Sequence, residues 1–71
     1  MAGRVPAGPV EVAPGGFVPE AEQAVILAAV LGGMELGAWD RRMVAWLAGW
    51  DAGTVLTIAS WVARSRAAGP C

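Results

Sequence analysis

The sequence predicts a small all-α domain of three helices that follows a disordered N-terminal arm. Prolines and glycines crowd residues 1–18, whereas apolar residues at helical spacing begin after Pro19. Two glycine breaks, Gly32-Gly33 and Gly49, then divide the rest of the chain into three stretches of helical length. We therefore expect an arm over 1–18, a three-helix domain over 19–68 and a tail over 69–71.

The arm has no helical or strand periodicity and is interrupted by Pro6, Pro9 and Pro14. Such a segment predicts disorder or loose packing. The same prolines break up any secretory signal, so we expect a cytoplasmic protein. Phe17 is the one aromatic anchor of the arm, and we expect it to fold back on the first helix as a hydrophobic staple.

The first helix is expected from Pro19 to Leu31. Proline suits the first helical position, and Glu20 and Glu22 put negative charge where the helix dipole favours it. The apolar residues of this helix point in every direction, so it has to be covered on more than one side.

The apolar run 24–34 raises the alternative of a membrane helix. It has eleven residues, well short of the ~20 that a membrane span needs. Charged residues follow at Glu35 and Asp40, and the pair Gly32-Gly33 stops or kinks the helix. A buried core helix is therefore favoured over a membrane-associated one, and no membrane span is expected.

The second helix is expected from Ala38 to Trp50 and has a bulky face and a small face. The bulky residues are spaced four, three and four apart, which puts them on one stripe: Trp39, Met43, Trp46 and Trp50. The opposite side carries Arg41, Ala45 and Ala48, with Arg42 and Val44 on its flanks. We expect the small face to pack on the third helix, which leaves the tryptophan stripe for the first helix or for another molecule.

The third helix is expected to start after a cap at Asp51 and to run to about Ala67. The expected inner face is Val55, Ile58, Ala59 and Val62, and the expected outer face is Thr57, Ser60 and Arg64, with Leu56 and Trp61 at the margins. The ordinary role of Arg64 and Arg66, in the last turn, is to complement the helix dipole.

The run Val44–Ile58 resembles the consensus of a helix-turn-helix unit. It is similar in a small first-helix residue at Ala45, a turn glycine at Gly49, expected at positive φ, and a cap at Asp51. It also has the apolar pair Val55 and Ile58. The resemblance implies a helix-turn-helix-like C-terminal pair and, as one alternative, a DNA-binding regulator.

The chemistry of the second helix of that pair weakens the DNA alternative. Its groove-facing positions carry no Arg, Lys, Asn or Gln able to make bidentate base contacts: Ala52, Gly53, Leu56, Thr57 and Ser60. The net charge of −1 also lacks the basic balance of a nucleic-acid binder. The candidate DNA contacts are Arg41, Arg42, Thr57, Ser60, Arg64 and Arg66.

The C-terminal half also resembles short uncharacterised proteins of actinobacteria, some of them near phage-like or mobile elements. The resemblance covers Leu36–Asp51, Thr54-Val55 and Arg64–Gly69. It implies a host type and little mechanism.

Composition argues against catalysis. The chain has no His, no Lys and no Tyr, and its single thiol is Cys71, which we expect to be inert. No metal, cofactor or small-molecule substrate is expected. Hydrophobic residues make up 56% of the 71 residues and four are tryptophans, more than so short a chain can bury. We therefore expect a non-enzymatic binding module that contacts a protein partner, or a second copy of itself, through Trp39, Met43, Trp46 and Trp50.

Overall fold

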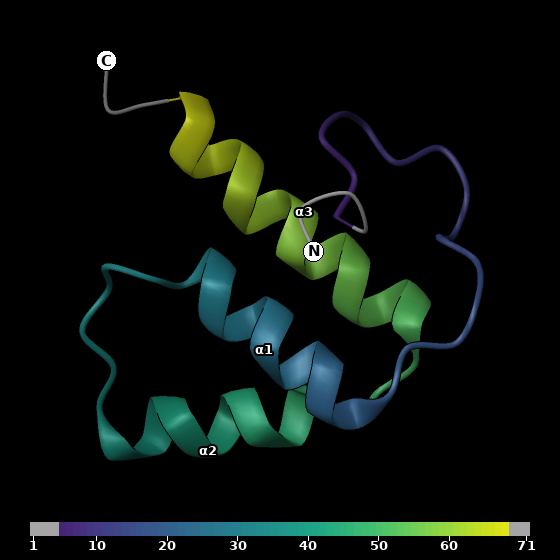
Figure 1. The fold of residues 1–71 in the computed structure, drawn as a ribbon. Helices are drawn as coiled ribbons and strands as arrows, with labels where there is room; N and C mark the ends of the chain where they lie inside the picture. Colours follow the sequence, from purple (N-terminus) through teal and green to yellow (C-terminus); the bar gives the residue numbers. More distant parts are fainter. Residues whose placement is uncertain (1–4, 69–71) are drawn as a thin grey trace.

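The chain folds into three helices, as the sequence predicts, with no strand among the residues described. The structure is a computed structural model that describes residues 5–68. In chain order the helices are α1 (Glu20–Val30), α2 (Ala38–Leu47) and α3 (Ala52–Ala68) (Figure 1). Residues 5–19 contain neither helix nor strand. The expected tail 69–71, with Cys71, lies outside the described residues.

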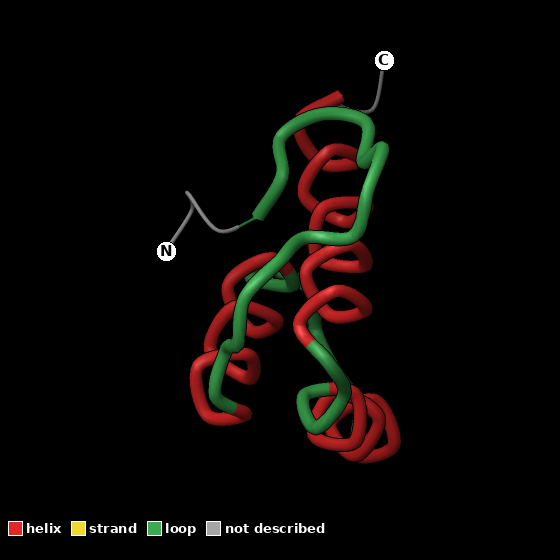
Figure 2. The backbone as a smooth tube through the Cα atoms, turned by 90° about the vertical axis from the view of Figure 1, so that its right-hand side faces the viewer, coloured by secondary structure: helices red, strands yellow, loops and turns green. Residues whose placement is uncertain are grey.

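Helix α1 lies beside α3 and runs in the same general direction, while α2 crosses below both (Figure 1). Viewed from the side, α2 is seen almost end-on at the foot of α3, and the arm runs along α3 (Figure 2). Helix α1 packs against both other helices. The expectation that the small face of α2 packs on α3 holds only at Ala48, which is buried in one cluster with Val55 of α3 and Leu27 of α1, whereas Arg41 and Ala45 are exposed.

Helix α1 begins one residue later than predicted. Pro19 is the residue before the helix, with extended backbone (φ −58°, ψ 149°), and its carbonyl accepts the first helical hydrogen bond, from the Gln23 N–H at 2.9 Å. Glu20 and Glu22 occupy the first turn as expected. The helix ends before the predicted glycine pair, and Gly33 adopts φ +87°, which glycine alone tolerates easily.

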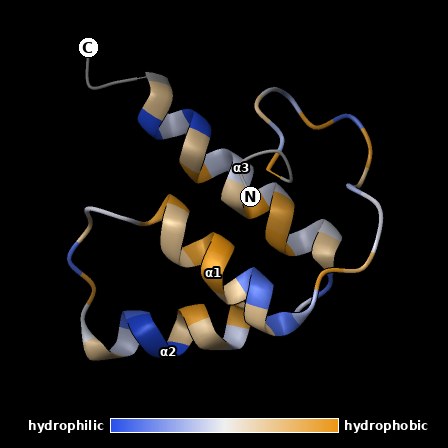
Figure 3. Ribbon diagram, viewed as in Figure 1, coloured by the Kyte–Doolittle hydropathy of each residue, from blue (hydrophilic) through white to orange (hydrophobic). Residues whose placement is uncertain are grey.

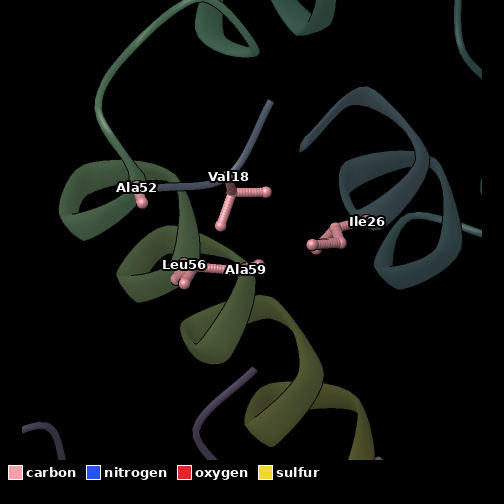
Figure 4. Close-up of a cluster of buried hydrophobic side chains, with 5 residues drawn as sticks. All are labelled: Val18, Ile26, Ala52, Leu56 and Ala59. Atoms are coloured by element: carbon pink, nitrogen blue, oxygen red, sulfur yellow. The ribbon is translucent and has the colours of Figure 1, made fainter. Parts of the chain in front are cut away.

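The main hydrophobic cluster joins the arm to α1 and α3. It consists of Val18, Ile26, Ala52, Leu56 and Ala59 (Figure 4). The arm supplies Val18, which is buried, whereas its neighbour Phe17 is 84% exposed. The hydrophobic staple expected at Phe17 is therefore wrong: the chain enters α1 with the side chain of Val18 turned inward and that of Phe17 turned to solvent.

A second cluster joins all three helices at Leu27, Ala48 and Val55. Between the two clusters, α1 is covered by α3 on one side and by the end of α2 on another. Cover is incomplete, because Val25 remains about half exposed. Figure 3 shows that hydrophobic residues are concentrated in α1 beyond its hydrophilic first turn, whereas the first half of α2 is mostly hydrophilic.

The connection between α2 and α3 is a tight turn, but its chemistry differs from the prediction. Helix α2 stops at Leu47 rather than Trp50, and the Gly49 and Trp50 N–H groups close short turns onto the carbonyls of Trp46 (3.2 Å) and Leu47 (2.9 Å). Gly49 is not at positive φ; among the described residues only Gly16 and Gly33 are. Each of these hydrogen bonds joins residues three positions apart, and together they turn the chain without left-handed backbone.

Asp51 caps α3 as predicted. Its carboxylate accepts the Thr54 N–H at 3.0 Å and the Thr54 hydroxyl at 2.9 Å. The bond from the Thr54 N–H has the larger effect and the bond from the hydroxyl the smaller, and both hold the pKa of Asp51 below its ordinary value. Within residues 5–68, no helix has the length and apolar character to cross a membrane.

Candidate protein-interaction surface

Three tryptophan side chains lie exposed on or next to α2. Trp39 is 67% exposed, Trp46 58% and Trp50 47%, and Met43 between them is half-buried. Trp39, Met43 and Trp46 are spaced four and three apart within the helix and share one side of it. Trp50 lies beyond the end of α2, in the turn. We call these four residues the tryptophan face.

The turn brings Trp50 back to the helix. The indole rings of Trp46 and Trp50 pack edge to face, with centroids 5.3 Å apart and planes at 71°. Aromatic rings prefer this geometry, in which the positive edge of one meets the negative face of the other. This contact restricts the rotamers of two exposed side chains. Less rotamer entropy is therefore lost when a partner covers them.

The opposite side of α2 explains why the tryptophans stay outside. Val44 and Leu47 pack against the cluster of Leu27, Ala48 and Val55. No residue of α2 between Ala38 and Leu47 is fully buried, because only this narrow side meets α1. Ala45, placed on the packed small face by the sequence, is exposed. A core of this size has no room for indole rings.

Polar residues flank the tryptophan face at the start of α2. The Asp40 carboxylate accepts the Gly37 N–H at 2.9 Å, which satisfies a donor at the helix N-terminus. The Arg41 guanidinium donates to the Leu36 carbonyl at 3.4 Å. Arg41 and Arg42 are both exposed. Trp39 is thus presented from a helix end that is capped and charged.

The candidate DNA contacts on α3 are differently placed from the prediction. Ser60, expected on the outer face, is fully buried, and its hydroxyl donates to the Pro6 carbonyl at 2.6 Å. Leu56, expected at a margin, is also buried. The arm covers the side of α3 that the sequence alone leaves open, so the outer-face assignment of Ser60 is wrong.

The other candidates on α3 are occupied in part by contacts within the chain. The Thr57 hydroxyl donates to the Gly53 carbonyl at 2.7 Å, and the Arg64 Nε donates to the Ser60 hydroxyl at 3.1 Å. The Arg66 Nη1 donates to the carbonyls of Val30, at 2.9 Å, and of Gly32. Arg66 thereby closes the C-terminus of α1 in addition to lying in the last turn of α3.

Sequence reasoning missed Gln23, the polar residue that connects the helices. Its side chain is 1% exposed, and its amide nitrogen donates to the carbonyls of Ala48 at 2.8 Å and Trp50 at 2.7 Å. Its Oε1 is buried without a hydrogen-bond partner. The signal was present, because Gln23 precedes Ile26 and Leu27 by three and four residues and so shares their buried face.

Gln23 fixes the turn that carries the tryptophan face. Since the last carbonyls of a helix have no partner within it, a side-chain donor from another helix can satisfy them. Here that donor comes from α1, and it holds both Ala48 and Trp50 in place. The backbone of Trp50 is thus held by a partly buried hydrogen bond from Gln23, while its ring is exposed.

No group of three or more His, Cys, Asp or Glu side chains that could hold a metal ion is found over residues 5–68. Comparison with protein-family models, with curated proteins and with solved structures gave no match to this chain. The resemblance to short actinobacterial proteins therefore stays a prediction, and any proposal of function rests on the geometry alone.

Proposed function

We propose that the chain is a cytoplasmic, non-enzymatic binding module whose tryptophan face contacts another protein surface, in the first instance a second copy of itself. The supporting observation is that the side chains of Trp39, Trp46 and Trp50 are each 47–67% exposed to solvent on one side of a 71-residue chain. Exposed apolar patches on small domains mark interaction sites. Tryptophan is also among the residues that contribute most to binding energy at protein interfaces.

Two further features favour a protein surface. The edge-to-face pair of Trp46 and Trp50 is already restrained before any partner arrives. Self-association would also bury apolar area that a three-helix chain cannot cover internally, which suits a fold with few core residues. The flanking Arg41 and Arg42 supply a polar rim of the kind found around interface cores.

DNA binding through the helix-turn-helix-like pair is the alternative, and it ranks second. Ser60 is buried, and Thr57, Arg64 and Arg66 already donate hydrogen bonds within the chain, so none of the predicted contacts on α3 is fully free for DNA. The net charge of −1 gives little long-range attraction to a duplex.

Sedimentation and tryptophan fluorescence across a dilution series test the proposal. We expect a larger species with blue-shifted emission at high concentration, which dissociates on dilution. Changing Trp39 and Trp46 together to Ala should abolish the larger species. The matched control is Trp61→Ala, because Trp61 is also 58% exposed but lies on α3.

A monomer with solvent-like emission at every concentration would rule out self-association, and equal loss in the Trp61 variant would remove the assignment to the tryptophan face. Circular dichroism confirms that the variants keep their helices. Retention of the unmodified protein on a DNA duplex column at low salt, lost when Arg41, Arg42 and Arg64 become Gln, would instead favour the alternative.

A further inference from the structure

A groove of about 840 Å³ lies between the C-terminal ends of α1 and α3 and residues 5–7 of the arm. Its size falls within the range of small-molecule sites, ~300–1,000 Å³. The walls are aliphatic and contain no aromatic ring; the principal apolar residues are Val5, Ile26, Ala29, Val30, Ala63 and Ala67. Such walls suit a flexible alkyl chain better than a flat ring.

The ionisable groups in the groove are all of one sign. Arg64 and Arg66 line it, and none of the six acidic residues of the chain does. An arginine beside an apolar surface without a carboxylate is a site for an anion, since the guanidinium presents a planar fork that fits a carboxylate with two hydrogen bonds.

Both guanidinium groups are held by hydrogen bonds within the chain before any ligand arrives. The Arg64 Nε donates to the Ser60 carbonyl at 3.4 Å and to the Ser60 hydroxyl at 3.1 Å. The Arg66 Nη1 donates to the Val30 carbonyl at 2.9 Å. The terminal nitrogens of Arg64 and the Nη2 of Arg66 make none of these bonds. They can therefore donate hydrogen bonds to a carboxylate at little cost in side-chain entropy.

We propose that this groove binds an aliphatic monocarboxylate. The carboxylate is held by Arg64 and Arg66, and the alkyl chain lies along Ile26, Ala29 and Ala63. Burial of the chain contributes affinity in proportion to its length, at roughly fourfold per methylene group, and the charge sets the orientation. The site is independent of the tryptophan face, because no residue of α2 lines it.

Calorimetric titration of the full chain with octanoate, octanol and acetate tests the proposal. We expect one saturable site for octanoate. Octanol should bind at least about tenfold more weakly, because it cannot form charge-assisted hydrogen bonds with the arginines. Acetate should show no saturable binding, because it has no chain to bury.

Variants locate the site. Arg64→Gln should weaken octanoate about tenfold by removing the fork, and Ala63→Phe should abolish binding by filling the groove while both arginines remain. Arg42→Gln is the matched control, an arginine on α2 outside the groove, and it should bind as the parent does.

Equal affinity for octanoate and octanol, no saturation by octanoate, or equal weakening by the Arg42 variant would each overturn the proposal. Helix content by circular dichroism, unchanged in Arg64→Gln and Ala63→Phe, separates loss of the site from loss of the fold.

Discussion

At the scale of single residues, Asp51 shows how one side chain fixes a helix start. Its two carboxylate oxygens accept the backbone N–H and the hydroxyl of Thr54. Because both bonds favour the charged form, the pKa of Asp51 is lowered in the folded chain. The sequence located this cap correctly, since aspartate before an apolar helical run is a strong local signal.

The lowered pKa predicts an acid-sensitive contribution to stability. A carboxyl whose pKa falls on folding stabilises the folded chain above its ordinary pKa of about 4, and this contribution is lost as the pH falls through the folded value. The free energy of unfolding should therefore be higher for the parent than for Asp51→Ala near neutral pH, with the gap closing as the pH falls below the ordinary pKa and through the folded value.

Urea denaturation at a series of pH values measures this difference. Asp51→Asn is the matched control, because it keeps an oxygen that accepts the Thr54 N–H but cannot be protonated in this range. Its advantage over Asp51→Ala should persist in acid. A parent that keeps its full advantage over Asp51→Ala in acid would show that the charge of Asp51 plays no part.

At the scale of elements, the two glycine breaks work by different means. Gly33 needs left-handed backbone (φ +87°) and a β carbon there would stand 3.2 Å from the Arg66 Nη2. Gly49 has no positive φ, and a β carbon would meet only ordinary contacts, the nearest being the Trp46 carbonyl oxygen at 3.5 Å. The helix-turn-helix consensus predicts positive φ at Gly49, but the structure has positive φ at Gly33 instead.

Alanine substitution should separate the two glycines. Gly49→Ala should leave stability unchanged or raise it by about 0.4–1 kcal/mol, since it restricts the unfolded chain without straining the folded one. Gly33→Ala should cost about 1–2 kcal/mol from left-handed backbone and should disturb the bond from Arg66 to the end of α1. Urea denaturation of both variants checks the order, and a larger loss at Gly49 would contradict the observed turn.

Element by element, sequence pattern gave good boundaries where the signal is local. The start of α2 at Ala38 and the cap of α3 agree with the prediction. The misplaced features depend on contacts distant in sequence: Ser60 is buried because the arm reaches it, and Trp50 leaves the helix because Gln23 holds its carbonyl. Helical periodicity describes one helix at a time and carries no information about such partners.

At the scale of the whole molecule, Gln23 connects all three helices. It lies on α1, and its amide nitrogen holds the Ala48 carbonyl at the end of α2 and the Trp50 carbonyl just before α3. Through these two bonds, one buried side chain of α1 positions both the end of α2 and the start of α3. The groove at the C-terminal end of α1 escaped the sequence analysis for a related reason, because its walls come from three separated segments.

Replacing Gln23 by the equally long Met should destabilise the chain by about 2 kcal/mol. The substitution leaves two carbonyls without their donor, at ~1–3 kcal/mol for each one that stays buried, and is offset in part by removal of the unpartnered Oε1. The midpoint of urea unfolding measures the loss.

Gln23→Glu should lose more at neutral pH and recover part of it in acid, because a carboxylate cannot donate to a carbonyl but a protonated carboxyl can. The Trp50 emission should shift in both variants as the turn loosens. A Met variant as stable as the parent would show that water replaces the amide at both carbonyls.

The hydrogen bond between Ser60 and Pro6 has a consequence for the order of folding. It joins groups 54 positions apart in the chain, so closing it confines nearly the whole polypeptide in one loop, whereas the turn between α2 and α3 closes within a few residues. Because contacts of long sequence separation carry the larger entropic cost, they form after the local ones. We therefore expect the arm to dock last, onto helices that have already assembled, and the burial of Ser60 to mark the completion of folding.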